Sequence, residues 1–282
     1  MFRRSLPRGR IRPAPLFFTL LLAGAAARAG DGPVDDWSLW LGAYDTTSDT
    51  TLWARGEAGD YAASGRLNLE RDLGLGRRQP VAQARLETRL GESQGLALEY
   101  FGFERSNTAT LAREFTWDGR TYEANAELRG QLAYDFASAT WRWWLGEGET
   151  RLAPGLGLAY YRVDTAFEGR ARLDDLAVEG RTASSDHAFA PLLSLAWRHA
   201  LAENVRVYAE FAGVAKPGGA LAGHIVDTQV GLEWFPFRRL GLALEYGGTQ
   251  IRLDRRRAGA DGSLEARLDL KLHGPSLLLR LR

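Results

Sequence analysis

A two-residue alternation of apolar and polar side chains, which runs from Trp37 to the end of the chain, constrains the fold more than any other feature of the sequence. Successive side chains of a β-strand point to opposite faces, so a period of two is typical of strands. Ala84 and Leu86 alternate with Gln83 and Arg85 in this way, and the sequence contains ten such runs. The alternation predicts an all-β protein.

The links between the runs alternate in length. Short polar links lie at 91–94, 146–149, 199–204 and 236–239, and long links lie at 45–80, 104–130, 164–187, 215–222 and 250–263. This order predicts an up-and-down antiparallel sheet with one plain end and one elaborated end, which is typical of transmembrane β-barrels. Within 104–130, the dipeptide Asp118-Gly119 between strand-like flanks predicts a hairpin, so some strands should project beyond the bilayer.

The first 29 residues differ from the rest and predict a cleaved secretory signal peptide. A basic start precedes an apolar stretch from Leu16 to Ala27, and the small-x-small sequence Ala27-Arg28-Ala29 precedes Gly30. The apolar stretch is shorter than the roughly 20 residues of a membrane-spanning helix; an uncleaved signal anchor is the alternative. Residues 1–29 contain six of the 36 basic residues and no acidic one, so 30 basic and 35 acidic residues leave residues 30–282 with a net charge of −5.

Three observations favour a membrane barrel over a soluble β-protein of the periplasm. The apolar face is bulky and the other face mixes small with charged residues, which suits lipid outside and a narrow lumen inside. A signal peptide without any Cys or long apolar helix fits a chain whose backbone hydrogen bonds run from strand to strand. Aromatic residues also gather beside the short links, as at a membrane–water interface. The predicted interfacial aromatics are Trp141, Trp143, Trp144, Trp197, Trp234 and Phe235.

The signal, the ten alternating runs and the terminal strand resemble the small outer-membrane β-barrel proteins of Gram-negative bacteria over residues 36–282. The resemblance implies one barrel domain, 30–282, located in the outer membrane. It also implies contact with outer-membrane lipid and lipopolysaccharide, and recognition of the last strand by the barrel-insertion machinery. About ten strands are expected, with eight and twelve as alternatives. The family usually ends in an aromatic residue, whereas this chain ends in Arg282. The apolar phase shifts between Leu272 and Leu277, and Gly274-Pro275 predicts a bulge there.

The polar face of the runs predicts a network of charges in the lumen. A barrel of about ten strands is largely filled by side chains, and opposite charges inside it should pair because an unpaired buried charge is costly. The predicted members are Arg85, Glu87, Arg89, Glu99, Arg142, Arg198, Arg206, Glu210, Glu233, Glu245, Arg267 and Asp269. A closed or very narrow lumen follows, with a narrow channel for a small solute as the alternative.

No catalytic, cofactor or metal site is predicted. The absence of Cys excludes thiol nucleophiles and Cys-ligated metals, and a net charge of +1 gives no case for a nucleic-acid partner. Asp186-His187 is the best candidate for a lipid- or peptide-cleaving site, but adjacent strand residues point to opposite faces. Residues 70–76 alternate poorly and predict a short turn or helix at the mouth. We therefore expect a non-enzymatic barrel with long extracellular loops and a structural or interaction role.

Overall fold

The computed structural model describes residues 32–58, 61–72, 74–117, 120–173, 176–216, 218, 221–259 and 262–282, so the predicted signal peptide lies outside the described residues. Among the described residues, no helix has the length and apolar character needed to cross a membrane. The elements are β1 (Trp37–Ala58), β2 (Tyr61–Asn68), α1 (Leu69–Asp72), β3 (Arg78–Arg89), β4 (Gln94–Trp117), β5 (Arg120–Trp143), β6 (Thr150–Leu173), β7 (Leu176–Ala202), β8 (Val205–Lys216), β9 (Leu221–Trp234), β10 (Leu240–Gly259) and β11 (Gly262–Leu281).

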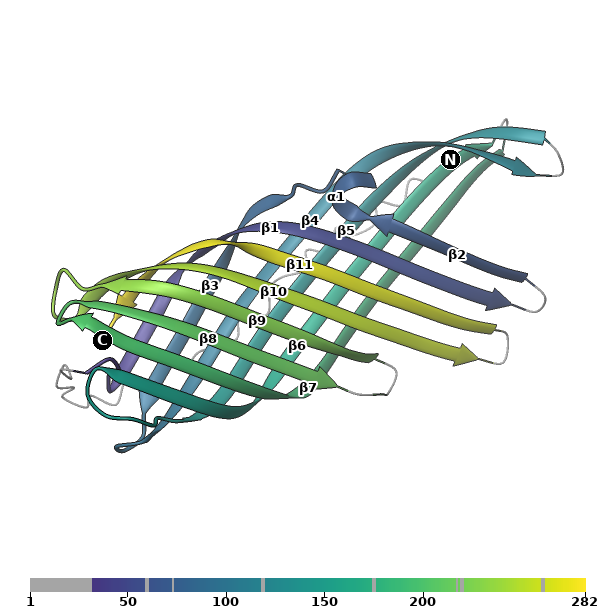
Figure 1. Cartoon of the computed structure of the whole chain (residues 1–282). Helices are drawn as coiled ribbons and strands as arrows, with labels where there is room; N and C mark the ends of the chain where they lie inside the picture. The colour runs from purple at the N-terminus through teal and green to yellow at the C-terminus, as the bar shows by residue number, and fades with distance from the viewer. Residues whose placement is uncertain are drawn as a thin grey trace, which may run out of the picture.

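Ten of these strands close into an antiparallel barrel (Figure 1). Strands β3 to β11 pair in sequence order, and β1 closes the ring by pairing with β3 on one side and β11 on the other. The predicted up-and-down barrel of about ten strands is confirmed. The first long link contains one additional strand, β2, which pairs with Thr51–Ala58 of β1 beyond the part of β1 that pairs with β3.

The short links are tight turns, whereas most of the predicted long loops are continuations of the strands. β4 and β5 have 24 residues each, although crossing a bilayer takes only about 9–11. The hairpin predicted within 104–130 is confirmed by the pairing of Phe115 with Tyr122 and of Trp117 with Arg120; its tip, Asp118-Gly119, lies outside the described residues. The end of the barrel opposite the short turns is therefore built of long paired strands (Figure 1).

The outer surface of the barrel changes character along the strands. Near the short turns it carries an exposed apolar belt, which includes Leu156, Leu158, Phe189, Leu193, Leu195, Val230, Leu232, Leu244, Leu277 and Leu279. On β7 the belt runs from Phe189 to Trp197, about the length that a tilted strand needs to cross the hydrocarbon core. Beyond the belt the outward residues include charged ones, such as Arg162 and Asp164 on β6. We call this second part of the barrel the extension.

The inside of the barrel has the opposite pattern, and β11 shows both halves. Leu277 and Leu279 face outward in the belt, whereas Leu268, Leu270 and Leu272 are buried inside the extension. The bulge predicted at Gly274-Pro275 is wrong, because the pairing of β11 with β10 continues through these residues without a register shift. The apolar phase switches because the medium outside changes from lipid to water, so the apolar side chains move from the outer face to the interior.

The helix α1 and the residues after it occupy the wall of the extension beside β4. β4 pairs with β3 only as far as Gly102, and beyond this point Asn107 Nδ2 donates a hydrogen bond of 2.8 Å to the carbonyl oxygen of Gly74. Leu69 and Leu75 are buried against the interior. Of the short turn or helix predicted for 70–76, the structure has a helix of four residues, Leu69–Asp72.

Candidate functional site in the barrel interior

A four-residue cluster of charges joins opposite walls of the barrel inside the belt. Arg142 contacts Glu87 at 2.8 Å and Glu210 at 2.7 Å, and Arg198 contacts the same two carboxylates at 2.7 and 3.1 Å. The four side chains are at most 12% exposed. They come from β5, β7, β3 and β8, each from an inward position of its strand. Each carboxylate lies between both guanidinium groups, so the four charges compensate one another.

A second group of ion pairs surrounds Arg85 on β3. The Arg85 guanidinium lies 3.4 Å from Glu245 and 3.7 Å from Glu99, which face it from β10 and β4. The Tyr208 hydroxyl on β8 donates a hydrogen bond to the same Glu245 carboxylate. The group therefore connects four strands across the lumen, as the Arg142 cluster does.

Trp40 on β1 lies between these groups and is fully buried. The ring meets Tyr208 edge-on at 5.4 Å between centroids, and the guanidinium of Arg280 lies 4.2 Å from the ring centroid. Arg85 approaches the same ring at 5.0 Å. A guanidinium over an aromatic face is attracted by the ring quadrupole, and the ring also takes up space in the lumen. Arg280 in addition forms an ion pair with the buried Glu233.

Asp35 and Phe235 fill the barrel at the short turns. Asp35 accepts hydrogen bonds from Arg206 at 2.9 Å and Arg280 at 2.7 Å, and Arg282 lies 3.4 Å away. The Phe235 ring is buried beneath Arg282 and Arg206, at 3.9 and 5.0 Å from their guanidinium carbons. One carboxylate thus gathers three arginines, including the last residue of the chain, around an aromatic ring.

A small cavity of about 30 Å³ lies inside the barrel, where the charged groups of the belt meet the extension. Glu99, Asp227, Gln229 and Thr249 are among the residues that line it. Thr249 donates a hydrogen bond to Asp227. Such a volume has room for about two water molecules.

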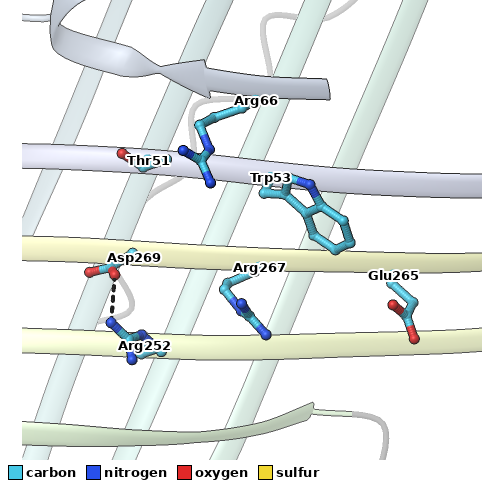
Figure 2. Close-up of a pocket in the computed structure, with 7 residues that line it drawn as sticks. All are labelled: Thr51, Trp53, Arg66, Arg252, Glu265, Arg267 and Asp269. Carbon is cyan, nitrogen blue, oxygen red and sulfur yellow. Dashed lines mark hydrogen bonds and ion pairs between the residues drawn. The ribbon is translucent and has the colours of Figure 1, made fainter. Parts of the chain in front are cut away.

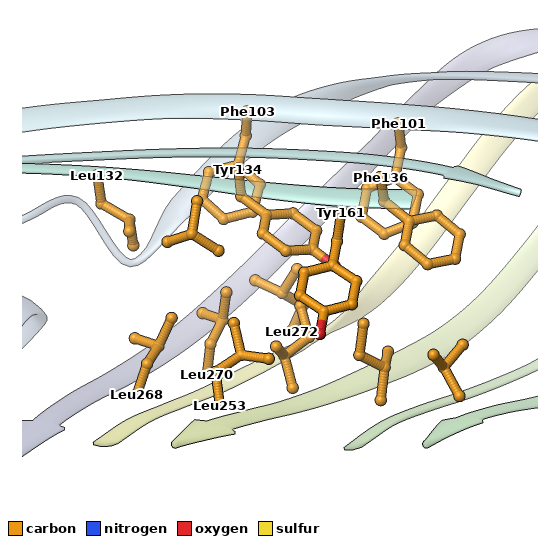
Figure 3. Packing of buried hydrophobic residues seen from close by; sticks show 14 of the residues in the cluster. Phe101, Phe103, Leu132, Tyr134, Phe136, Tyr161, Leu253, Leu268, Leu270 and Leu272 are labelled. Atoms are coloured by element: carbon orange, nitrogen blue, oxygen red, sulfur yellow. The ribbon is translucent and has the colours of Figure 1, made fainter. Parts of the chain in front are cut away.

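An apolar layer fills the extension above the cavity (Figure 3). Phe101 stacks on Phe136 with centroids 5.0 Å apart, and Phe103 packs against Tyr134 at 5.7 Å. From the opposite wall, Leu268, Leu270 and Leu272 of β11 face these rings (Figure 3). The layer also contains Leu132, Tyr161, Ile225, Ile251 and Leu253.

A buried ion pair fastens α1 to this layer. Arg105 Nη1 lies 2.7 Å from Glu70 Oε1, and the two side chains are 4% and 1% exposed. The Thr50 backbone N–H and hydroxyl donate to the Glu70 carboxylate at 2.6 and 2.8 Å. Arg105 Nη2 donates to the Thr50 hydroxyl at 2.9 Å. The Glu70 carboxylate is thus satisfied by partners on β1 and β4.

Three predicted lumen residues lie elsewhere. Arg89 pairs with Asp36 at the rim of the barrel, where both are about one-third exposed. Arg267 and Asp269 lie on the outer face of the extension, and this corrects their predicted position in the lumen. The reason is the phase switch of β11, which turns its polar side outward above the belt. The hydrogen bond from Arg267 to Asp254, 2.6 Å long, raises the pKa of the Arg267 guanidinium.

The predicted interfacial aromatics divide between the two faces. Trp141, Trp143, Trp197 and Trp234 are exposed on the outside of the belt near the short turns. Trp144 and Phe235 are buried inside, where Trp144 lies 5.4 Å from the Arg198 guanidinium. Each follows directly after an outward Trp, and adjacent strand residues point to opposite faces.

Asp186 and His187 do not form a common site. Asp186 faces inward and lies 2.9 Å from Arg255, whereas His187 is exposed beside the Tyr160 ring on the outer face. His199 stacks on Trp197 outside the barrel. Among the described residues, no three His, Asp or Glu side chains are grouped so that they could hold a metal ion.

Several interior residues were not predicted. Trp40, Tyr208 and Arg280 occupy the inward phase of their strands, so the alternation itself was the signal that could have identified them. Asp35 precedes the first strand, and no periodicity marks it. Glu70 and Arg105 are 35 positions apart in the sequence, and Glu70 lies in a helix of only four residues. No local sequence pattern predicts that they pair.

The sequence matches no protein-family model and no curated protein. Similar solved structures include the outer-membrane protease OmpT from Escherichia coli, with 9% identity, coverage of 86% of this chain and 97% of OmpT, and a TM-score of 0.53. The translocator domain of the autotransporter NalP from Neisseria meningitidis shares 12% identity, with coverage of 84% and 88% and a TM-score of 0.44. At these identities the likeness concerns the fold. The belt, the closed ring of strands and the likeness in fold to OmpT together identify the chain as a β-barrel protein of the Gram-negative outer membrane.

Proposed function

We propose that the protein is a closed barrel with a structural or interaction role, which presents its extension outside the cell. One observation carries the proposal: a layer of paired charges inside the belt is followed along the barrel by the apolar layer of the extension. An ion that entered the lumen would have to displace compensated buried charges and then cross an apolar zone. Both steps are costly.

The predicted alternative of a narrow channel has less support. Its strongest element is the polar cavity beside Glu99 and Asp227, whose volume is about 30 Å³. The apolar layer lies between this cavity and the outside. The alternative of a lipid- or peptide-cleaving enzyme is weakened by the opposite orientations of Asp186 and His187.

Partners of this closed barrel follow from its surfaces. The apolar belt faces membrane lipid, and the charged extension lies at the level of the sugars of lipopolysaccharide. Contact with the barrel-insertion machinery through the outward Leu277 and Leu279 of the last strand also belongs to the proposal.

Conductance in planar bilayers tests the closed lumen. We expect no discrete current steps from the full-length folded protein, because both interior layers oppose ion entry. Heat-modifiable mobility on SDS gels verifies that the sample is folded, and a pore-forming peptide added at the end verifies that the bilayer reports conductance. Discrete steps that scale with the amount of folded barrel would contradict the proposal and favour the narrow channel.

A further inference from the structure

A groove of about 480 Å³ lies on the outer face of the extension, where β2, β1, β11 and β10 stand side by side (Figure 2). Cross-strand register builds it: Trp53 on β1 pairs with Arg66 on β2 and with Arg267 on β11. In a neighbouring row, Asp269 on β11 pairs with Arg252 on β10. An aromatic ring, three guanidinium groups and the carboxylates of Asp269 and Glu265 therefore share one side of the sheet.

The guanidinium groups in the groove differ in what they already bind. Arg252 lies 3.0 Å from Asp269, and Arg267 lies 2.6 Å from Asp254, so each of these two cations is held in place by a carboxylate. Arg66 forms no ion pair within the part of the chain that the structure describes, and its side chain is exposed. Arg66 is therefore the cation of the groove whose guanidinium group can bind an anionic group of a ligand.

The groove also holds an acceptor without a donor. Asp269 binds Arg252 through Oδ2, while its Oδ1 is buried and has no hydrogen-bond partner among the described residues. The Asp269 side chain as a whole is 26% exposed, and a carboxylate oxygen can accept more than one hydrogen bond, so this carboxylate can also accept a hydrogen bond from a hydroxyl group in the groove. Trp53 is half-buried and lies in the neighbouring row, opposite Arg267, where it offers an apolar ring face. Hydroxyl donors on an apolar ring are the chemistry of a saccharide.

We propose that this groove binds a saccharide that carries an acidic group. The sugar ring lies against Trp53, a sugar hydroxyl donates to the Asp269 carboxylate, and the carboxylate or phosphate of the saccharide meets Arg66. The inference names a partner for the proposed interaction role of the extension, and rests on that role. It does not depend on a closed lumen.

The height of the groove identifies the source of the saccharide. Asp269 lies eight residues beyond the belt residue Leu277 on β11. At about 3.3 Å per residue and a tilt of about 40°, this places the groove roughly 20 Å above the belt. The groove opens sideways from the barrel wall, so it faces the sugars of the surrounding outer leaflet. The partner is therefore the acidic core oligosaccharide of lipopolysaccharide in the same membrane.

Calorimetric titration tests the site on the full folded barrel in detergent, with deacylated core oligosaccharide as the probe. We expect saturable binding that weakens at least about tenfold in Trp53→Ala, Arg66→Gln and Asp269→Asn, because each loses a stacking contact or a charge-assisted hydrogen bond. Trp53→Phe retains most of the affinity because it keeps a ring. Lys271→Gln is the matched control: it removes one exposed cation from the same face outside the groove, and changes the affinity less than twofold.

A second probe assigns the acidic group. The same oligosaccharide without its phosphates and with its carboxylates reduced should bind the natural protein about as weakly as the acidic probe binds Arg66→Gln. The uncharged oligosaccharide should bind Arg66→Gln almost as well as it binds the natural protein. Equal weakening of binding by Lys271→Gln and Arg66→Gln would overturn the site, because it would indicate nonspecific charge attraction. Absence of binding by the natural protein and all variants would also overturn it. Binding of a soluble uronate oligosaccharide but not of the core oligosaccharide would overturn the outer-leaflet source. Conductance plays no part in this readout, so its outcome is separate from the test of the closed lumen.

Discussion

Arg142 and Glu210 show how a charge is tolerated inside the belt. Each has a partner at 2.7 Å, and each also belongs to the four-residue cluster with Glu87 and Arg198. A buried pair of this kind contributes little net stability compared with apolar side chains, but removal of one member leaves the other charge without compensation. The cluster should therefore be sensitive to single deletions.

We expect Glu210→Ala to lower the free energy of unfolding by about 3 kcal/mol, because it leaves Arg142 and Arg198 with only Glu87 between them. Denaturant unfolding in lipid vesicles, followed by gel mobility, measures the change. Asp36→Ala is the matched control, since the Asp36–Arg89 pair is about one-third exposed. This control should cost less than about 1 kcal/mol. Equal effects of the two variants would show that burial does not set the importance of the lumen charges.

For β11, the sequence predicts the strand and its lipid-facing residues correctly, but it predicts the wrong face for two charged residues. The alternation was enough to identify it as a strand and to place Leu277 and Leu279 on the lipid side. It also placed Arg267 and Asp269 in the lumen, because a period of two fixes the relative phase of neighbours but does not say which medium lies outside. Above the belt that medium is water, and the same apolar phase then marks the interior.

The first long link shows a second limit of the sequence. A short helix could be predicted from the loss of alternation in 70–76, whereas its fastening by Glu70 and Arg105 could not. The pair depends on the wall of the extension that β1 and β4 form only after the barrel has closed. Local patterns carry no information on such a contact.

We expect Glu70→Ala to release α1 from the wall, because Arg105 would be left buried without its carboxylate. Amide hydrogen exchange over residues 69–72 and 74–77 should become at least about tenfold faster, whereas exchange in the belt strands stays unchanged. Arg71→Ala removes an exposed ion pair with Asp72 from the same helix and serves as the control. Unchanged exchange in Glu70→Ala would mean that the apolar contacts of Leu69 and Leu75 alone hold the segment.

For the whole molecule, the outer face of the barrel meets lipid at the belt and water along the extension. This explains why the mean hydropathy is that of an ordinary water-soluble protein. The mean hydropathy is −0.27, because alternate residues meet lipid only along the belt, and above it the outer face is charged. Closure and strand number could be predicted from period and link length, and the membrane location from the bulky apolar face, the aromatic residues beside the short links and the signal sequence. The projection of strands beyond the bilayer could also be predicted, from the hairpin signal in 104–130, whereas the change of the apolar side from outward to inward could not, because each half has the same period.

Export provides a prediction for the chain as a whole. We expect the protein recovered from the outer membrane to begin at Gly30, because Ala27-Arg28-Ala29 presents small residues at the positions that signal peptidase reads. Intact-mass measurement of the purified protein checks this. A mass that includes residues 1–29 would favour the signal anchor instead.

Along β11 the apolar side chains change from the outer face in the belt to the inner face in the extension. The closed lumen and the sugar groove both rest on this change. The chain has no Cys, so single cysteines carrying a nitroxide label can be placed along 265–281 one at a time, and their collisions with oxygen and with a water-soluble nickel complex measured in vesicles. We predict oxygen contact at positions 277 and 279, nickel contact at 267 and 269, and neither at 268, 270 and 272. Oxygen contact at 268, 270 and 272, with 267 and 269 shielded, would contradict the account.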